Sequence, residues 1–404
     1  MNYQKETITQ YINYIAVAYA FLIPLSRAGI GILTALFVLL WILEGNFRYK
    51  FSLYKNSKVI ISLVLFILFG LISLIWTDDK YTAIYLMKRY WYLLPIFVFI
   101  SSLKKEYISK ILTAFILGMF VSEVIAYGVF FKIWHFSHAT VDNPSPFMHH
   151  IEYSIFLALT ALILLNRIFN YGDIKYKIFY ALFFMTVTGN LFLTNGRTGQ
   201  IAFIIGLFTL ALLSFKSKIK ALLVFIFLGA FIIIIAFNLS HTFKTRIIIA
   251  KEDVVRVIEK KQYCSSVGGR IGSWIVSKEI ITSNPILGVG VQDNMKEFHR
   301  IIDEKYPSMK CMHSSFVHTH NQFLQVLTSL GVIGLVIFLS IFYYIIKTKV
   351  IDRELHHIKY IYLAVLFFAF MPEVMWGRQF SLALSALIFG MLLAQNRIEK
   401  EIDV

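Results

Sequence analysis

Long uninterrupted apolar stretches restrict the folds open to this sequence more than any other feature does. They run for about 17–25 residues, the length that an α-helix needs to cross a hydrocarbon core of about 30 Å. A transmembrane β-barrel would instead show alternating segments of about 10 residues. Hydrophobic residues make up 58% of the 404 residues and charged residues only 15%, which excludes soluble globular and disordered chains. The sequence therefore predicts an all-α, polytopic membrane protein.

We predict about twelve membrane-spanning helices in the chain. Residues 1–238 would hold the first nine helices, and residues 321–404 the last three with a cytoplasmic tail. Between them lies a long loop, residues 239–320, with helix-like stretches near residues 245–259 and 271–283. No cleavable signal pattern is visible, so the first span is expected to stay. The spans lie near residues 10–26, 28–44, 59–76, 84–101, 107–131, 150–166, 174–193, 198–215, 218–238, 321–346, 358–371 and 379–395.

Basic residues are distributed unevenly between the two sets of loops. The loops on the side of the termini hold about 20 of the 39 Lys and Arg residues, and the opposite short loops hold about seven. Because cytoplasmic loops carry an excess of basic residues, both termini are expected in the cytoplasm and the long loop on the outer side. The net charge of +16 is then largely a topology signal, and nucleic acid binding is not indicated.

Two arginine motifs lie at the predicted outer face. Arg197 is part of a short glycine-containing turn, Thr194–Gln200, between spans seven and eight. Arg270 lies among glycines ahead of a predicted helix, where free backbone N–H groups could face an anion. Guanidinium groups bind phosphate in a bidentate manner and stay charged at any pH. Taken singly, each Arg could equally be an anchor at the membrane surface or part of a plain helix start.

A histidine motif, His318-Thr319-His320-Asn321, directly precedes span ten. A His at the interface can accept a proton near neutral pH. The two histidines are two residues apart, so on a continuing helix they face different directions and do not suit one metal site. Gly331 and Gly334 lie three residues apart within the span, which favours close packing against another helix.

Other polar groups offer competing sites. Asp78-Asp79, on an outer loop, could bind a divalent cation, although a solvated loop explains the pair as well. Lys88-Arg89, at the outer start of span four, could contact a phosphate or lipid headgroups. Neither a GxxxxGK[ST] or GxGxxG phosphate loop nor a Ser-centred nucleophile elbow occurs. Zinc could bind a further cluster, whose spacing matches no zinc motif: His135, His138, Asp142, His149, His150 and Glu152.

Both cysteines of the chain, Cys264 and Cys311, lie in the long loop. An outward compartment is oxidising, so a disulfide between them is expected there. Two unpaired thiols are the alternative interpretation.

Taken together, these motifs resemble the O-antigen ligase and polymerase superfamily. The order and spacing of Arg197, Arg270 and His320 are similar to those of that family. The family also has a similar His-Asn pair followed by spaced glycines, which here are His320-Asn321, Gly331 and Gly334. The arrangement of about twelve spans with one long periplasmic loop between spans nine and ten is similar as well. The motifs cover residues 195–335, and the first half of the chain resembles the family only in topology.

The resemblance implies metal-independent, cofactor-free glycosyl transfer in the bacterial inner membrane. The donor would be O-antigen polysaccharide on undecaprenyl pyrophosphate, and the acceptor a sugar hydroxyl of lipid A–core at the periplasmic face. Arg197 and Arg270 would bind the diphosphate, and His320 would be the catalytic base. Further substrate contacts are expected from four residues: Lys88, Arg89, His318 and Asn321.

Two other functions fit parts of the pattern. An O-antigen polymerase or a protein O-oligosaccharyltransferase of the same superfamily would use similar donor chemistry, and protein-modifying relatives usually carry extra sequence after the core. A lipid or small-molecule transporter would place ionisable groups near the bilayer midplane, often in inverted repeats. The predicted spans here are nearly free of charge except at Glu123, and the polar groups gather at the outer face, which favours the enzyme.

Overall fold

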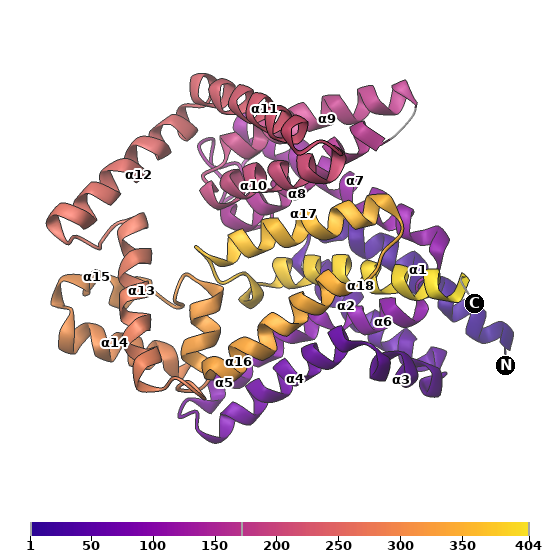
Figure 1. Cartoon of the computed structure of the whole chain (residues 1–404), viewed down its shortest axis with the longest axis horizontal. Coiled ribbons are helices and arrows are strands. Elements are labelled where there is room, and N and C mark those ends of the chain that lie inside the picture. The colour runs from indigo at the N-terminus through magenta and orange to yellow at the C-terminus, as the bar shows by residue number, and fades with distance from the viewer. Residues whose placement is uncertain (1, 171–172, 403–404) are drawn as a thin grey trace.

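Figure 1 shows the computed structural model of the chain, which describes residues 2–170 and 173–402. All regular elements in these ranges are helices. The long connection between α7 (Lys105–Phe130) and α8 (His150–Asn170) adds two isolated β-bridges, between Phe136 and Ala139 and between Thr140 and Asn143. The predicted all-α fold is therefore confirmed.

Ten segments of the described chain are long and apolar enough to cross a membrane, and all ten match predicted spans. Two further predicted spans correspond to α1 (Asn2–Leu22) and α17 (Arg353–Phe370), which are helical but fall outside this measure. The structure thus supports a multi-pass membrane protein with ten of the twelve predicted spans. The ten are α2 (Arg27–Glu44), α4 (Lys58–Ile72) with η1 (Ser73–Ile75), α5 (Lys80–Met87) with η2 (Lys88–Leu93) and α6 (Pro95–Ser102), α7, α8, α9 (Ile174–Leu193), α10 (Arg197–Ser214), α11 (Lys218–Leu239), α16 (Gln322–Lys347) and α18 (Gln379–Ile402).

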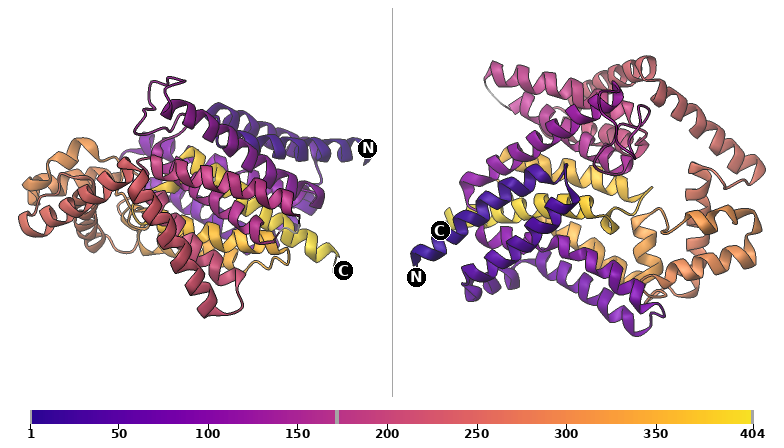
Figure 2. Two further views of the ribbon diagram at one scale, coloured as in Figure 1. Left: turned by 90° about the horizontal axis from the view of Figure 1, so that it is seen from above. Right: turned by 180° about the vertical axis from the view of Figure 1, so that it is seen from behind.

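Two helices form the centre of the bundle. The apolar windows of α8 and α18 are 94% and 89% buried, and each is surrounded by other helices. α8 packs against α9, α10 and α17, while α18 packs against α6 and η2. α11 is only 17% buried, so its apolar surface is suited to contact with lipid. Figure 2 shows the same arrangement from two further sides, and Figure 1 shows the short α3 (Phe47–Asn56) near the termini.

Residues 239–320, the loop segment, project from the end of the bundle opposite the termini (Figures 1 and 2). They form α12 (His241–Lys260), α13 (Ser266–Ser283), α14 (Asp293–Lys305), η3 (Pro307–Met309) and α15 (Cys311–Ser315). These helices have a small hydrophobic core of their own, separate from that of the bundle. It consists of Val257, Tyr263, Val276, Ile280, Met295, Phe298, Ile301, Ile302, Met309 and Met312.

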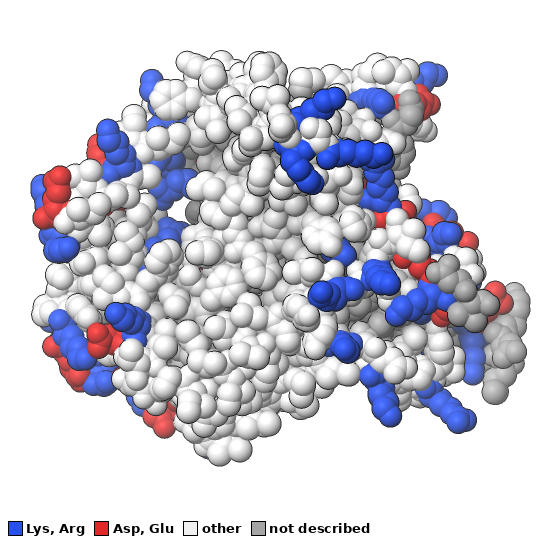
Figure 3. All heavy atoms as spheres, in the orientation of Figure 1, with Lys and Arg blue, Asp and Glu red and all other residues white. Residues whose placement is uncertain are grey.

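Most charged side chains on the face in Figure 3 lie toward the two ends of the molecule. Lys and Arg gather near the termini, and charges of both signs surround the loop segment. A broad uncharged surface lies between these two zones. This distribution fits a bundle that spans a hydrocarbon layer between two polar regions.

The loop segment is hydrogen-bonded directly into one of the spans. α16 is interrupted at Gly331, whose φ of 63° and ψ of −167° are not helical. At this break the backbone N–H groups of Val289 and Gly290 donate to the carbonyl oxygens of Thr328 and Ser329, at 3.0 and 2.9 Å. The predicted role of Gly331 in helix–helix packing is therefore wrong. This glycine instead interrupts α16, so that the segment around Val289 and Gly290 can hydrogen-bond to the helix backbone.

Replacing Gly331 with Ala should destabilise the protein. A Cβ at this position would lie 2.1 Å from the carbonyl oxygen of Ile286, and the positive φ is itself unfavourable for Ala. We expect a loss of about 1–3 kcal/mol or more, measured as a lower melting temperature in detergent. Gly229→Ala is the matched control, because the nearest atoms to its Cβ lie 3.9 Å away. Equal melting temperatures for the two variants would contradict the helix break.

Candidate active site

Four ionisable side chains converge on Glu373, which lies between α17 and α18 and is fully buried. Nδ1 of His320 is 2.7 Å from Oε1 of Glu373, and Nη2 of Arg270 is 3.6 Å from the same oxygen. Nη2 of Arg378 is 2.8 Å from Oε2, and Nε2 of His318 is 3.9 Å from it. The carboxylate therefore joins the loop segment, the start of α16 and the segment before α18 at one point.

The sequence around the histidines builds a rigid turn. Asn321 is the N-cap of α16, and its side-chain oxygen accepts two backbone N–H groups of the first turn. The side chain of Gln325 accepts the N–H of Thr319 at 3.0 Å. His320 adopts a left-handed backbone with φ 49°, which directs its ring and that of His318 to the same side, 4.3 Å apart. The prediction that the two histidines face different directions is therefore wrong, because neither lies on the helix.

Glu373 fixes which nitrogen of His320 is free. Burial alone would raise the pKa of Glu373, but the hydrogen bond from His320 and the charges of His318, His320 and Arg378 lower this pKa to about 2. The ionised carboxylate can only accept, so Nδ1 of His320 donates to it. In the tautomer with its proton on Nδ1, Nε2 has a lone pair that can take up a proton. Burial lowers the pKa of His318 to about 4, so that ring is neutral at pH 7.

The two arginines predicted as a pair do meet. Nη2 of Arg197 and Nη1 of Arg270 donate to the same hydroxyl, Oγ of Ser266, at 2.7 and 3.1 Å. Nε of Arg270 also donates to the carbonyl oxygen of Pro372 at 3.1 Å, which holds its side chain against Glu373. Among the described residues, no carboxylate lies within 4.0 Å of the Arg197 guanidinium. Two cations on one hydroxyl with one carboxylate beside them form an anion-binding arrangement.

The motif around Arg197 is shaped by close contact with α8. Gly199 donates its N–H to Oγ of Ser154 at 3.1 Å. A Cβ at Gly196 would lie 2.3 Å from that side chain, so only glycine fits there. Arg197 is consequently fixed as the first residue of α10, at the end of the bundle that carries the loop segment.

The motif around Arg270 differs from its prediction. α13 begins at Ser266 with Ser265 as its N-cap, so Arg270 lies in the second turn of the helix and not ahead of it. The neighbouring glycines do not open onto a ligand either. A Cβ at Gly269 would lie 2.7 Å from Phe316, and one at Gly272 would lie 2.9 Å from Met312. The glycines therefore let the α15 region pack closely, and the Arg270 side chain, not the helix N-terminus, is the group available to an anion.

Comparison with known proteins finds one matching family model. Residues 181–339 match the family model of the O-antigen ligases. This segment of the chain is similar to the O-antigen ligase family. The family domain contains Arg197, Arg270 and His320 together with the whole loop segment, whereas Glu373 and Arg378 lie beyond it. No curated protein gives a significant match.

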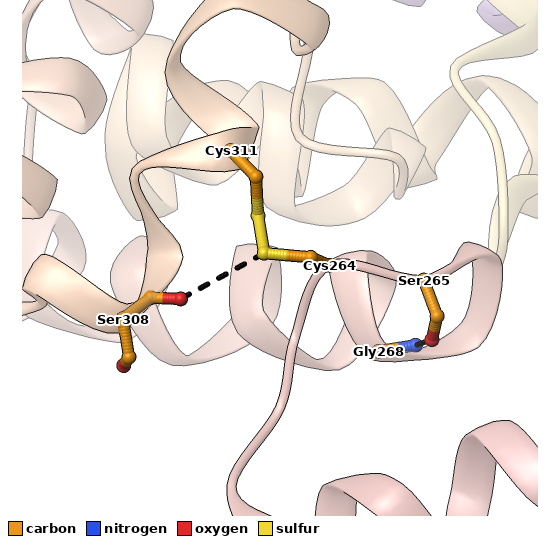
Figure 4. Close-up of a disulfide and its surroundings, with 5 residues drawn as sticks. All are labelled: Cys264, Ser265, Gly268, Ser308 and Cys311. Carbon is orange, nitrogen blue, oxygen red and sulfur yellow. Dashed lines mark hydrogen bonds between the residues drawn. A yellow bond between two sulfur atoms is a disulfide. The ribbon is translucent and has the colours of Figure 1, made fainter.

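A disulfide within the family domain joins Cys264 to Cys311 (Figure 4). It ties the residue before the N-cap of α13 to the first residue of α15. Both cysteines line a cavity of about 370 Å³ together with Arg270 and His320. The disulfide therefore holds together the segment that carries Arg270 and the segment that leads to His320.

The structure also places the competing clusters. Oδ2 of Asp78 pairs with Nζ of Lys296 at 2.8 Å, and Asp79 caps α5 by accepting the N–H of Thr82. The lysine lowers the pKa of Asp78. Both carboxylates are thus engaged by protein groups. Within the described ranges, the competing zinc cluster around residues 135–152 is not among the groups whose ligand atoms converge.

The one set of converging metal-ligand atoms in the described chain is formed by His318, His320 and Glu373, whose ligand atoms lie within 4.8 Å of one another. Such a set could hold a metal ion. Arg270 and Arg378 contact the same carboxylate, however, and their charges oppose the binding of a cation there. The geometry favours Glu373 as the partner of His320 and of the arginines.

The sequence reasoning missed Glu373, Arg378 and Ser266. Glu373 and Arg378 are the two charged residues of the short segment between the last two predicted spans, and both lie on the predicted outer side. Their charge and their position on the outer side could have identified both as candidate site residues. Ser266 gave none, because one serine beside a helix start has many structural explanations.

Replacing Glu373 with Gln should separate catalysis from binding. The amide keeps a hydrogen-bond acceptor for Nδ1 of His320 but no longer stabilises a positive ring. We expect the rate of the reaction to fall by about 10²-fold or more, within the usual range for general-base catalysis. Binding of the anionic substrate should be equal or tighter, because Arg270 and Arg378 lose their counter-charge. A parallel loss of binding and rate would mean that Glu373 only maintains the fold.

Proposed function

We propose that the protein is an O-antigen ligase, an inverting glycosyltransferase that needs no metal ion. It transfers O-antigen polysaccharide from undecaprenyl pyrophosphate to a sugar hydroxyl of lipid A–core. The observation that carries this proposal is the pairing of a His–carboxylate couple with two arginines on one hydroxyl. The O-antigen ligase family domain supports the same chemistry.

Arg197 and Arg270 bind the diphosphate of the donor. As the bond to the sugar breaks, negative charge grows on the diphosphate, and guanidinium groups already in place stabilise that charge. Their planar geometry suits two phosphate oxygens at once. In this role the two arginines replace the divalent cation that many glycosyltransferases use.

His320 acts as the general base. Nε2 takes the proton of the acceptor hydroxyl while the hydroxyl oxygen attacks the anomeric carbon. The bond between that carbon and the diphosphate oxygen breaks, and the electron pair leaves with undecaprenyl pyrophosphate. Glu373 stabilises the protonated ring that results, as the carboxylate does in other His-based catalysts. Attack from the side opposite the leaving group inverts the anomeric centre.

The protein works in the bacterial inner membrane with its site at the periplasmic face. The excess of basic residues near the termini supports a cytoplasmic position for that end. The loop segment and the His320 site at the opposite end then meet the periplasm, where the disulfide is stable. The lipid part of the donor lies in the bilayer beside the apolar helices.

Lipopolysaccharide from a deletion strain tests the proposed function. A ligase predicts loss of the whole O-antigen ladder on a gel, with accumulation of lipid-linked polymer. A single-repeat band would show that the chain is a polymerase of the same superfamily. An unchanged ladder with loss of a glycoprotein would show a protein O-oligosaccharyltransferase.

The two histidines should behave differently in a transfer assay with purified protein. We expect His320→Ala to lose about 10²–10⁴-fold in rate while lipid-linked donor still binds. His318→Ala should keep most of its activity, because its ring contacts Oε2 of Glu373 only at 3.9 Å. Arg270→Ala is the contrasting variant, which should lose donor binding. An inactive His318→Ala with an active His320→Ala would show that His318 is the base.

Chelation tests the metal-free mechanism. Purified enzyme in EDTA should keep full activity, because guanidinium groups supply the positive charge at the diphosphate. The same assay after addition of Zn²⁺ or Mg²⁺ should show no gain. If EDTA abolishes transfer and one of these ions restores it, His318, His320 and Glu373 form a metal site and the base assignment fails.

A further inference from the structure

A second cationic cavity lies at the same end of the bundle, outside the family domain. It has a volume of about 450 Å³ and is lined by basic side chains from three parts of the chain. Arg27 is the first residue of α2, Lys88 and Arg89 begin η2, and Arg378 directly precedes α18. Four aromatic residues line the same cavity: Tyr85, Trp91, Tyr92 and Phe380.

The charge of this cavity is not balanced by the protein. Glu152 is its only carboxylate among the described residues, and that side chain is buried and accepts the hydroxyl of Ser381. Within the described chain, no carboxylate lies within 4.0 Å of the charged groups of Arg27, Lys88 or Arg89. Cations gathered in a cleft attract an anionic ligand and raise its local concentration.

Most of these cations retain donors for a ligand. Lys88 is exposed, and Arg27 is exposed with its guanidinium over the ring of Phe380, 5.5 Å from the centroid. Arg89 uses Nη1 to donate to the carbonyl oxygen of Gly377 at 2.7 Å, which leaves its other N–H groups available. The aromatic rings beside them offer flat apolar faces, on which the C–H faces of a sugar ring can pack.

The cavity is connected to the catalytic pair. It shares Tyr85, Arg89, Gly377 and Arg378 with a neighbouring cavity of about 460 Å³, which is lined by His318 as well. Arg378 contacts Oε2 of Glu373, whereas His320 and Arg270 contact Oε1. A ligand in the cationic cavity is thus linked to His320 through Arg378 and Glu373, away from the two arginines on Ser266.

We propose that this cavity binds a negatively charged sugar unit of the acceptor, through a phosphate or carboxylate group. The inference rests on the proposed function and adds the means of acceptor recognition. Inversion requires the attacking hydroxyl and the leaving diphosphate on opposite sides of the anomeric carbon, so a charged group of the acceptor would be held at a site separate from that of the diphosphate. Arg197 and Arg270 serve the donor, while Arg27, Lys88 and Arg89 serve the acceptor.

The test compares acceptors with purified full-length protein in detergent. The probes are lipid A–core and the same material after chemical removal of its phosphates. The variant is Arg27→Ala/Lys88→Ala, and the matched control is Lys80→Ala, an exposed lysine of the neighbouring α5 outside the cavity. Direct binding of each acceptor is measured beside the KM values for acceptor and donor, so that the readout does not depend on transfer.

For the double variant we expect acceptor affinity to fall and acceptor KM to rise by about tenfold or more, with donor KM and kcat little changed. Dephosphorylated acceptor should bind wild-type protein as weakly as intact acceptor binds the double variant. Its affinity for the double variant should fall no further. If only carboxyl-reduced acceptor reproduces the loss, the recognised group is a carboxylate and the proposal stands. A higher donor KM, or an equal loss with acceptors that carry neither phosphate nor carboxylate, would overturn it. Acceptor binding that depends on Arg27 and Lys88 without any transfer would support this site and refute the ligase.

Discussion

The organisation of the site depends on one buried carboxylate, that of Glu373. A buried charge without partners is very costly, and removing one partner of a buried pair typically costs about 3–5 kcal/mol. Here the partners come from α13, from the turn before α16 and from the segment before α18. The carboxylate is satisfied only when these three parts of the chain are correctly placed, so the same contacts that orient His320 also select the folded arrangement around it.

Two further devices keep the loop segment in a fixed place on the bundle. Backbone hydrogen bonds join the loop segment to α16 at the Gly331 break, and the side chain of Asn294 donates to the hydroxyl of Thr328 at 3.1 Å. Inside the segment, the Cys264–Cys311 disulfide supplements a small hydrophobic core. Catalytic groups need positions defined to a fraction of an ångström, and loops alone rarely provide this. Rigid attachment at several points lets an irregular segment do so.

Much of the fold and part of the site could be predicted from sequence. Apolar length located the helices, and motif order brought Arg197, Arg270 and His320 to one place. Glu373 could not be paired with His320, because the two are 53 residues apart and only tertiary packing joins them. The start of α13 was misplaced because glycines lower helix propensity, whereas the Ser265 cap and packing against the α15 region overcome this. Local patterns describe local structure and leave such contacts open.

The position of α18 has a consequence for how the protein is assembled. This helix is synthesised after all the other described helices, yet 89% of its apolar window is buried among them. It must therefore enter the middle of a bundle whose other members already lie in the membrane. Until it does, the segment that carries Glu373 has no fixed position, and the buried faces of α6 and η2 stay open to lipid. The contacts around Glu373 are therefore completed only after α18 has been inserted among the helices that precede it.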